Sequence, residues 1–218
     1  MKNMARILSA ALQALAILGA ATFLEAGYKA KPWNMRVRES YPANLASEGV
    51  TIAVEPLYTD ALAAQVFNKE DMVTRGIMPL AILVFNDNDF PIKVEGLSVE
   101  LMHEGDRIRT MTANEVVYRL SKRDKAWIGQ PMPKLSPSQL NRDQLDDFDD
   151  KFLMSKTVGP HDKGGGFLYL HIADSKDLMS YLADSTIYIP KVYREDTGSR
   201  LIFFEIGLGA AVKGNSNR

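Results

Sequence analysis

The sequence predicts a mainly β fold, an immunoglobulin-like antiparallel β-sandwich with short helices and a helical, proline-rich insertion. Three observations predict it: about six to eight short apolar or alternating segments, hairpin-like turn sequences between them, and helical patterns that are short and confined to connections. We expect residues 45–212 to form a single domain with an insertion at 121–165. A flexible tail at 213–218 is expected to follow it.

Two strands and a short helix are predicted in the first third of this domain. Residues 51–56 alternate and end at Pro56, which is typical of a strand. The next segment has Thr59 or Asp60 as a cap and a short apolar stripe, which predicts a helix of about two turns. Residues 77–85 are apolar on both faces, so we expect a strand that is covered from both sides.

The run Asn86-Asp87-Asn88-Asp89 is either a cluster of metal ligands or a turn. Asn and Asp tolerate left-handed backbone angles and hydrogen-bond to their own main chain, which suits a tight connection. A calcium loop of the EF-hand type needs ligands, a glycine and a glutamate at a fixed spacing that is absent here. We therefore interpret the run as a turn. Farther on, the alternation changes phase at Gly96, which predicts a β-bulge.

Three helices are predicted in the remaining connections. Thr112-Ala-Asn-Glu115 has the layout of a capping box that begins a short helix. Inside the insertion, Ser136 is expected to cap a second helix with Pro137 at its first position. An apolar stripe at helical spacing follows, formed by Leu145, Phe148 and Phe152. Aspartates occupy the other side, so we expect an amphipathic helix on the surface. Residues 174–183 predict the third helix.

The last third is predicted to contain a glycine loop, a strand and a hairpin. Residues 159–166 are glycine-rich and lead into an alternating strand at 167–172. A phosphate-binding loop would open a helix and end in Gly-Lys-Ser/Thr, and neither feature is present. Segments 186–193 and 200–208 flank a polar turn with Gly198 at its bend, which predicts a hairpin.

Residues 1–21 predict an export signal peptide. Lys2 and Arg6 precede an apolar run of roughly 15 residues, and small residues offer a cleavage site after Ala21. The run is short for the ~20 residues that a membrane-spanning helix needs. An uncleaved signal anchor at residues 7–24 is the alternative. We expect the protein to be exported to the periplasm, the cell envelope or the medium.

The composition disfavours several classes of partner. Cysteine is absent, so no disulfide stabilises the fold. The chain has 26 Lys+Arg against 27 Asp+Glu, and removal of Lys2 and Arg6 leaves 24 against 27. This balance does not support nucleic-acid binding. We expect membrane contact only through an uncleaved N-terminal helix, and we expect no cofactor.

The sequence offers few residues for catalysis or metal binding. It has no cysteine nucleophile and no Gly-x-Ser-x-Gly elbow, so we expect a protein that is not an enzyme. Close His/Asp pairs give only a weak indication of a metal site. The candidates for such a site are His161, Asp162, His171 and Asp174.

Aromatic and basic residues suggest a surface for binding another protein. Trp127 lies in a proline-rich connector, where it either pins the connector to the domain or anchors a partner. The candidate partner-binding residues are Trp127, Lys122, Arg123, Lys125, Phe167 and Tyr169. The last two are expected to form an aromatic row on the outer face of a strand.

The stretches ILVFNDNDFPIKVEGLSVEL and STIYIPKVYREDTGSRLIFFEIGL resemble uncharacterised bacterial exported proteins and lipoproteins with an immunoglobulin-like sandwich. The resemblance implies a fold and an exported location, although this chain lacks the cysteine that anchors a lipoprotein. We expect a non-enzymatic protein that binds to, or is a structural part of, an assembly with another envelope protein. The alternative is a small-molecule, carbohydrate or metal-binding protein, or a hydrolase, that uses loops at one end of the sandwich.

Overall fold

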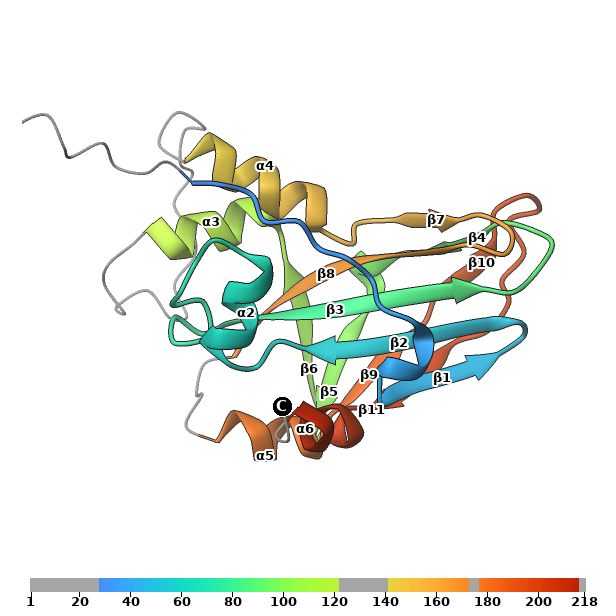
Figure 1. Cartoon of the computed structure of the whole chain (residues 1–218). Helices are drawn as coiled ribbons and strands as arrows, with labels where there is room; N and C mark the ends of the chain where they lie inside the picture. The colour runs from blue at the N-terminus through green and yellow to red at the C-terminus, as the bar shows by residue number, and fades with distance from the viewer. Residues whose placement is uncertain (1–27, 122–140, 173–176, 216–218) are drawn as a thin grey trace, which may run out of the picture.

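The computed structural model describes residues 28–121, 141–172 and 177–215. Its main feature is one antiparallel sheet of eight strands. In spatial order these are β1 (Ala43–Ser47), β2 (Val50–Pro56), β3 (Ile77–Asn86), β8 (Lys163–His171), β6 (Asp106–Met111), β5 (Glu100–His103), β9 (Thr186–Ile189) and β11 (Phe204–Gly207). The two end strands, β1 and β11, lie against each other, so the sheet is nearly closed into a barrel (Figure 1).

The predicted mainly β class is confirmed, whereas the immunoglobulin-like sandwich is not. A sandwich consists of two sheets packed face to face. Here eight strands are hydrogen-bonded in one continuous order, and the second sheet has only three short strands. These are β10 (Val192–Arg194), β4 (Ile92–Val94) and β7 (Lys156–Val158). Alternation of apolar and polar residues identifies strands but does not say which strands pair, so the sequence could not distinguish the two arrangements.

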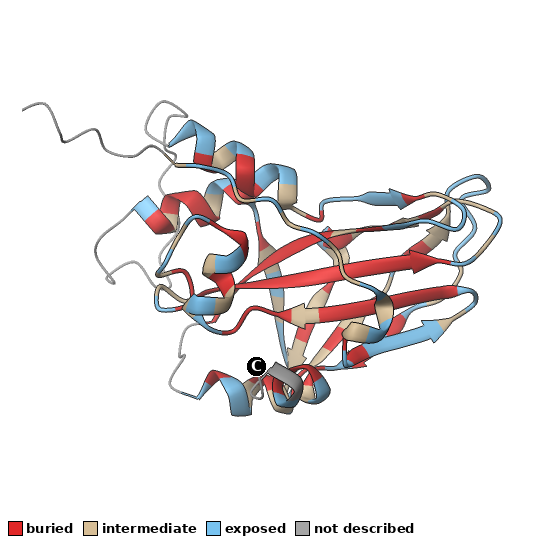
Figure 2. Cartoon of the chain, in the orientation of Figure 1, coloured by how far each residue is buried: buried red, intermediate tan, exposed pale blue. Residues whose placement is uncertain are grey.

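Strand β3 lies in the middle of the molecule, as its apolar sequence predicts. All of its residues are buried, and it pairs with β2 on one side and β8 on the other (Figure 2). The predicted helix after β2 is also present as α2 (Asp60–Val66). Its cap is Thr59, whose side-chain oxygen accepts a hydrogen bond from the Leu62 amide at 3.1 Å.

The Asn86–Asp89 run is a turn, as predicted, and its first residue holds the turn together. The buried Asn86 side chain donates hydrogen bonds to the carbonyl oxygens of Phe90 and Gly159, at 2.8 and 2.9 Å. Its oxygen accepts one from the Asn88 amide at 3.1 Å. The polar run is therefore explained by main-chain hydrogen bonding alone.

The β-bulge predicted at Gly96 is wrong. A short 3-10 helix, η2 (Gly96–Ser98), stands there between β4 and β5. Because β4 and β5 belong to different sheets, the change of phase needs no bulge. The glycine has another role, since a Cβ at this position would lie 1.6 Å from the Leu153 carbonyl oxygen. Glycine thus permits a close backbone approach.

Helices α3 (Ala113–Ser121) and α4 (Arg142–Lys151) pack against each other beside one end of the barrel (Figure 1). The predicted capping box begins α3, because the Thr112 amide donates to Glu115 Oε2 at 2.7 Å. Asn141 caps α4, and the expected cap Ser136 lies outside the described residues. Phe148 of α4 is completely buried, so this helix contributes to the core.

The C-terminal part contains the predicted hairpin in a shorter form. Strands β9 and β11 pair antiparallel, with Phe204 opposite Ile189. The segment between them includes β10, which pairs with β4 and also bridges to Arg200 across the turn. That turn contains Gly198, whose φ of 68° requires glycine-like freedom. The predicted helix at 174–183 is described from Asp177 onward as α5 (Leu178–Ala183).

Both ends of the chain are described only in part. The expected signal peptide (1–21) and signal anchor (7–24) lie outside the described residues. The expected tail begins inside α6 (Gly209–Asn215), so its first residues are helical rather than frayed. Within the described part of the chain, no helix is long and apolar enough to cross a membrane.

Candidate functional site

An extended segment before β1, residues 28–37, crosses the outside of the barrel, and we call it the N-terminal strap. Figure 1 shows it in blue, running from α4 across β8 and β3 to the short helix η1 (Arg38–Ser40). Residues 29–34 make no backbone hydrogen bond to any other described residue. Side chains therefore hold the strap in place.

The strap is fastened near both of its ends. At the start, the Tyr28 hydroxyl donates to Asp147 Oδ2 of α4 at 2.5 Å. Burial, reinforced by the Asp147 carboxylate, raises the pKa of Tyr28 above its ordinary value, so the phenol stays a donor. Just after the strap, Arg38 holds Asp87 through two hydrogen bonds of 2.7 Å. These bonds lower the pKa of Asp87.

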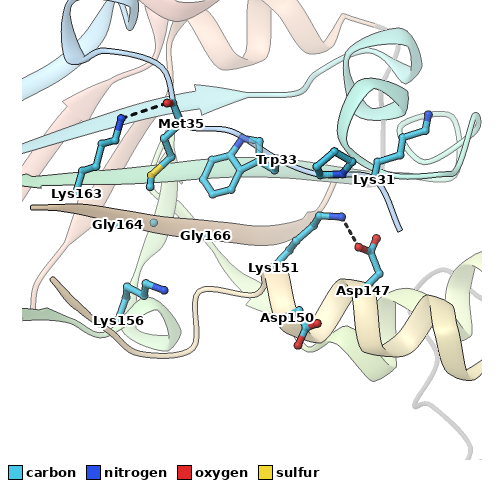
Figure 3. A pocket seen from close by; sticks show the side chains of 12 residues that line it. Lys31, Trp33, Met35, Asp147, Asp150, Lys151, Lys156, Lys163, Gly164 and Gly166 are labelled. Carbon is cyan, nitrogen blue, oxygen red and sulfur yellow. Dashed lines mark hydrogen bonds and ion pairs between the residues drawn. The ribbon is translucent and has the colours of Figure 1, made fainter. Parts of the chain in front are cut away.

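An open groove of about 420 Å³ lies beneath the strap (Figure 3). The strap forms one wall, α4 and β7 form the other, and the first residues of β8 form the floor between them. We call it the strap groove. It is lined by Lys31, Pro32, Trp33, Met35, Asp147, Asp150, Lys151, Lys156, Lys163, Gly164, Gly165 and Gly166.

The glycines of the floor allow the second wall to approach β8 closely. A Cβ on Gly164 would lie 2.9 Å from Val158 Cγ2, and a Cβ on Gly166 would lie 2.9 Å from the Lys151 carbonyl oxygen. The prediction of a flexible loop over these glycines is therefore corrected, because Gly164 to Gly166 belong to β8. Gly164 and Gly166 are buried against this wall, and Gly165 between them is partly exposed.

The groove is locally positive in a chain that is slightly negative. Four lysines and two aspartates give it a formal charge of +2, against −1 for the whole chain. Lys151 is paired with the Asp147 carboxylate, and the Lys31 ammonium group donates to the Ala64 carbonyl oxygen while keeping its charge. The ammonium groups most open to a ligand belong to the other two lysines.

Those two lysines, Lys156 and Lys163, are weakly engaged. Among the described residues, the hydrogen-bond partner of Lys163 Nζ is the Met35 carbonyl oxygen, at 3.4 Å. Lys156 is exposed and has no hydrogen bond or ion pair with any described residue. Figure 3 places the two on opposite sides of β8 at the same end of the groove. This end can offer two ammonium groups to one ligand.

Past the glycines, β8 is covered by aromatic side chains. Phe167 and Tyr169 are completely buried, and the Tyr169 hydroxyl donates to the Phe148 carbonyl oxygen at 2.7 Å. Trp33 of the strap packs on Phe167 with ring centroids 4.6 Å apart. The predicted aromatic row thus has no exposed surface for a partner, because the strap and α4 cover it.

The predicted metal-binding residues do not come together. His161 precedes β8 and His171 ends it, so about 30 Å of extended chain separates them. His161 Nε2 lies 2.8 Å from Asp89, Asp162 accepts from the Lys163 amide, and Asp174 lies outside the described residues. Among the described residues, no group of three or more His, Asp or Glu side chains could hold a metal ion.

Elsewhere in the described part of the chain, His103 and Ser185 form a pair whose geometry is structural. His103 Nδ1 lies 3.1 Å from Ser185 Oγ, and the His103 ring stacks on Tyr181. Ser185 is buried, and its hydroxyl donates to the Tyr181 carbonyl oxygen at 2.7 Å. The single hydroxyl proton of Ser185 is used in the bond to Tyr181. In this arrangement His103 Nδ1 donates to Ser185 Oγ, so His103 does not act as a base toward that oxygen.

Sequence reasoning missed the groove residues. The predicted partner residues Lys122, Arg123, Lys125 and Trp127 lie outside the described part of the chain. A signal for the groove was present in Lys29-Ala-Lys-Pro-Trp33, where an aromatic residue, proline and lysines precede the first strand. Lysines on both sides of the glycine run could only be recognised as neighbours of that segment once the fold was known.

Comparisons with known proteins give only distant likenesses. No family model and no curated protein matches the sequence. Among solved structures, the yjhA protein from Bacillus subtilis has 9% identity and a TM-score of 0.36, covering 68% of this chain and 78% of that one. A Bacillus subtilis protein provisionally described as a lipoprotein, ycdA, has 10% identity and a TM-score of 0.36 over 76% of this chain. The match spans 38% of ycdA.

Proposed function

We propose that this chain is an exported, non-enzymatic binding protein of the cell envelope and that the strap groove is its binding site. The observation that carries the proposal is the groove itself: an open cavity with a glycine floor, a tryptophan in one wall and weakly engaged lysines at one end. Concave sites with a few converging polar groups are where proteins most often bind ligands.

The architecture supports binding rather than catalysis. The described residues that line the groove include lysines and aspartates but no histidine, serine or tyrosine that could act with them as a nucleophile and base. The histidine–serine pair of His103 and Ser185 lies elsewhere and has its hydroxyl proton turned away from the histidine. The exported location rests on the N-terminal sequence, with its short basic region and apolar run.

Site-specific photo-crosslinking in the native cell tests this proposal. A photoreactive phenylalanine analogue replaces Asn34, an exposed strap residue between Trp33 and Met35. In the control it replaces Phe203, which is exposed beyond β10. We expect a discrete adduct in the exported fraction from position 34 and none from position 203. Equal adducts from both positions, or none from position 34, would contradict the proposal.

A further inference from the structure

We propose that the strap groove binds an extended acidic peptide segment of a partner protein. This inference rests on the proposed function and specifies the chemistry of the partner. It follows from three features of the described residues: the placement of two lysines, the unpaired backbone of the strap, and the shape of the groove floor.

The two lysines flank one point on the floor. Lys163 directly precedes Gly164, and Lys156 Cε lies 3.3 Å from the position that a Cβ on Gly164 would occupy. Figure 3 shows one lysine on each side of β8 at this point. A carboxylate at this end of the groove would therefore have one ammonium group available on each side of β8. Such charge-assisted contacts are stronger than those between neutral groups.

The walls of the groove favour an extended chain. Residues 29–34 of the strap have backbone groups without hydrogen bonds to other described residues. On the other side, β7 is an edge strand of the small sheet. Unpaired extended backbone of this kind is what a peptide uses when it binds by strand addition. In an extended peptide, side chains on one face recur about every 7 Å, so acidic residues can alternate toward the lysines.

Other occupants fit these features less well. A basic segment would be repelled by the two weakly engaged lysines, and a divalent cation finds no cluster of ligands among the described residues. A small inorganic anion would satisfy the lysines but would leave the strap backbone without hydrogen-bond partners among the described residues. The acidic peptide is the occupant that uses all three features.

Fluorescence anisotropy with defined peptides tests the inference on the full chain. The probe is a labelled seven-residue peptide that alternates glutamate and valine. The matched probe carries lysine in place of glutamate. We expect the acidic probe to bind and the basic probe not to bind. The affinity for the acidic probe should also fall as salt is added, because salt screens the exposed charges.

Charge reversal at the two lysines should weaken binding selectively. We expect Lys156→Glu with Lys163→Glu to lower the affinity for the acidic probe by about tenfold or more. Lys156→Gln with Lys163→Gln should give a smaller loss. Both lysines are exposed, so these variants should keep the stability of the parent. Arg107→Glu with Lys191→Glu makes the same change in net charge outside the groove and should bind like the parent.

Three results would overturn the inference. They are equal binding of both probes, equal losses from the groove and control variants, or displacement of the acidic probe by inorganic phosphate at a comparable concentration. The last would identify a small-anion site. If the partner crosslinked from position 34 still binds the Lys156→Glu, Lys163→Glu variant normally, the acidic-peptide inference fails while the groove remains the binding site. Absence of the crosslink itself would count against the proposed function.

Discussion

The two halves of strand β8 differ in the size of their side chains and in what lies next to them. The first half, Lys163 to Gly166, is nearly bare of side chains and forms the floor of an open groove. The second half carries Phe167 and Tyr169, which are completely buried beneath the strap and α4. Trp33 stands at the boundary, because it packs on Phe167 and also lines the groove.

In our proposal, one surface of the small barrel serves both stability and binding. Aromatic burial removes a large apolar area from water and ties the strap and α4 to the sheet. The glycines in the neighbouring half have no side chain to bury, but they let β7 and the end of α4 approach the strand. We infer that the aromatic half stabilises the walls and that the glycine half leaves the space between them free.

The largest expected loss of stability comes from disturbing the packing over the aromatic half of β8. Phe148 of α4 is completely buried, and its ring centroid lies 5.4 Å from that of Tyr169 on β8 and 4.7 Å from that of Phe67. Phe148→Ala should lower the free energy of unfolding by about 3–5 kcal/mol, because it removes these contacts and leaves a cavity. Denaturant unfolding measures the loss. Met179, which is exposed on α5, provides the control, since Met179→Ala should change stability by less than about 0.5 kcal/mol. A loss below about 1 kcal/mol for Phe148→Ala would argue against the aromatic half as a core.

A smaller loss is expected on the glycine half. Gly166→Ala should destabilise by about 1–3 kcal/mol, because its Cβ would lie 2.9 Å from the Lys151 carbonyl oxygen. Gly207→Ala is the matched control on a strand, since nothing lies within 4 Å of the added Cβ. The same unfolding experiment compares the two. Equal stability of the two variants would mean that the wall does not approach β8 as described.

The hydrogen bond that holds the start of the strap should contribute less to stability than either of these packing contacts. Tyr28→Phe removes the hydroxyl that donates to Asp147 and leaves Asp147 bonded to Lys151. We expect a loss of about 1 kcal/mol, the usual net value of one hydrogen bond. Tyr193→Phe removes a hydroxyl that makes no hydrogen bond to a described residue and should be neutral. If Tyr28→Phe is equally neutral, the strap is not held through this hydroxyl.

The smallest effect is a pH dependence at the far end of β8. Burial, with a further contribution from Arg119, lowers the pKa of His171 below its unfolded value of about 6.5. The unfolded state therefore binds the proton first, and stability falls as the pH drops through that range. His171→Gln should lose less stability than the parent between pH 7.5 and pH 5.5. The difference should be a fraction of a kcal/mol, because the half-buried ring is partly screened by water. Identical pH profiles would contradict the assigned shift.

The sequence predicted the individual elements better than their assembly. The buried β3, the Asn86 turn and the Thr112 capping box were all readable, because each depends on residues close together in the chain. Strand pairing is a long-range property. Nothing in residues 186–208 shows that β9 also pairs with β5 and that β10 also pairs with β4, and so the nearly closed barrel was not predicted.

The candidate site shows the same limit. Phe167 and Tyr169 were placed on an outer face, but their burial depends on Phe148 and Trp33, which are distant in sequence. Similarly, the glycine run looked like a loop, because its close neighbours Val158 and Lys151 become evident only in the folded chain. Lys156 and Lys163 could be recognised as groove residues only once the fold placed the strap beside them.

Lysine footprinting in the native cell tests the central claim most directly. Acetylation of the protein in intact cells and after purification would be compared residue by residue by mass spectrometry. If a partner occupies the strap groove, Lys156 and Lys163 should be protected in the cell and reactive in the purified chain, while exposed Lys191 should react equally in both. Equal reactivity of Lys156 and Lys163 in the two samples would contradict the groove as the site where this protein binds its partner.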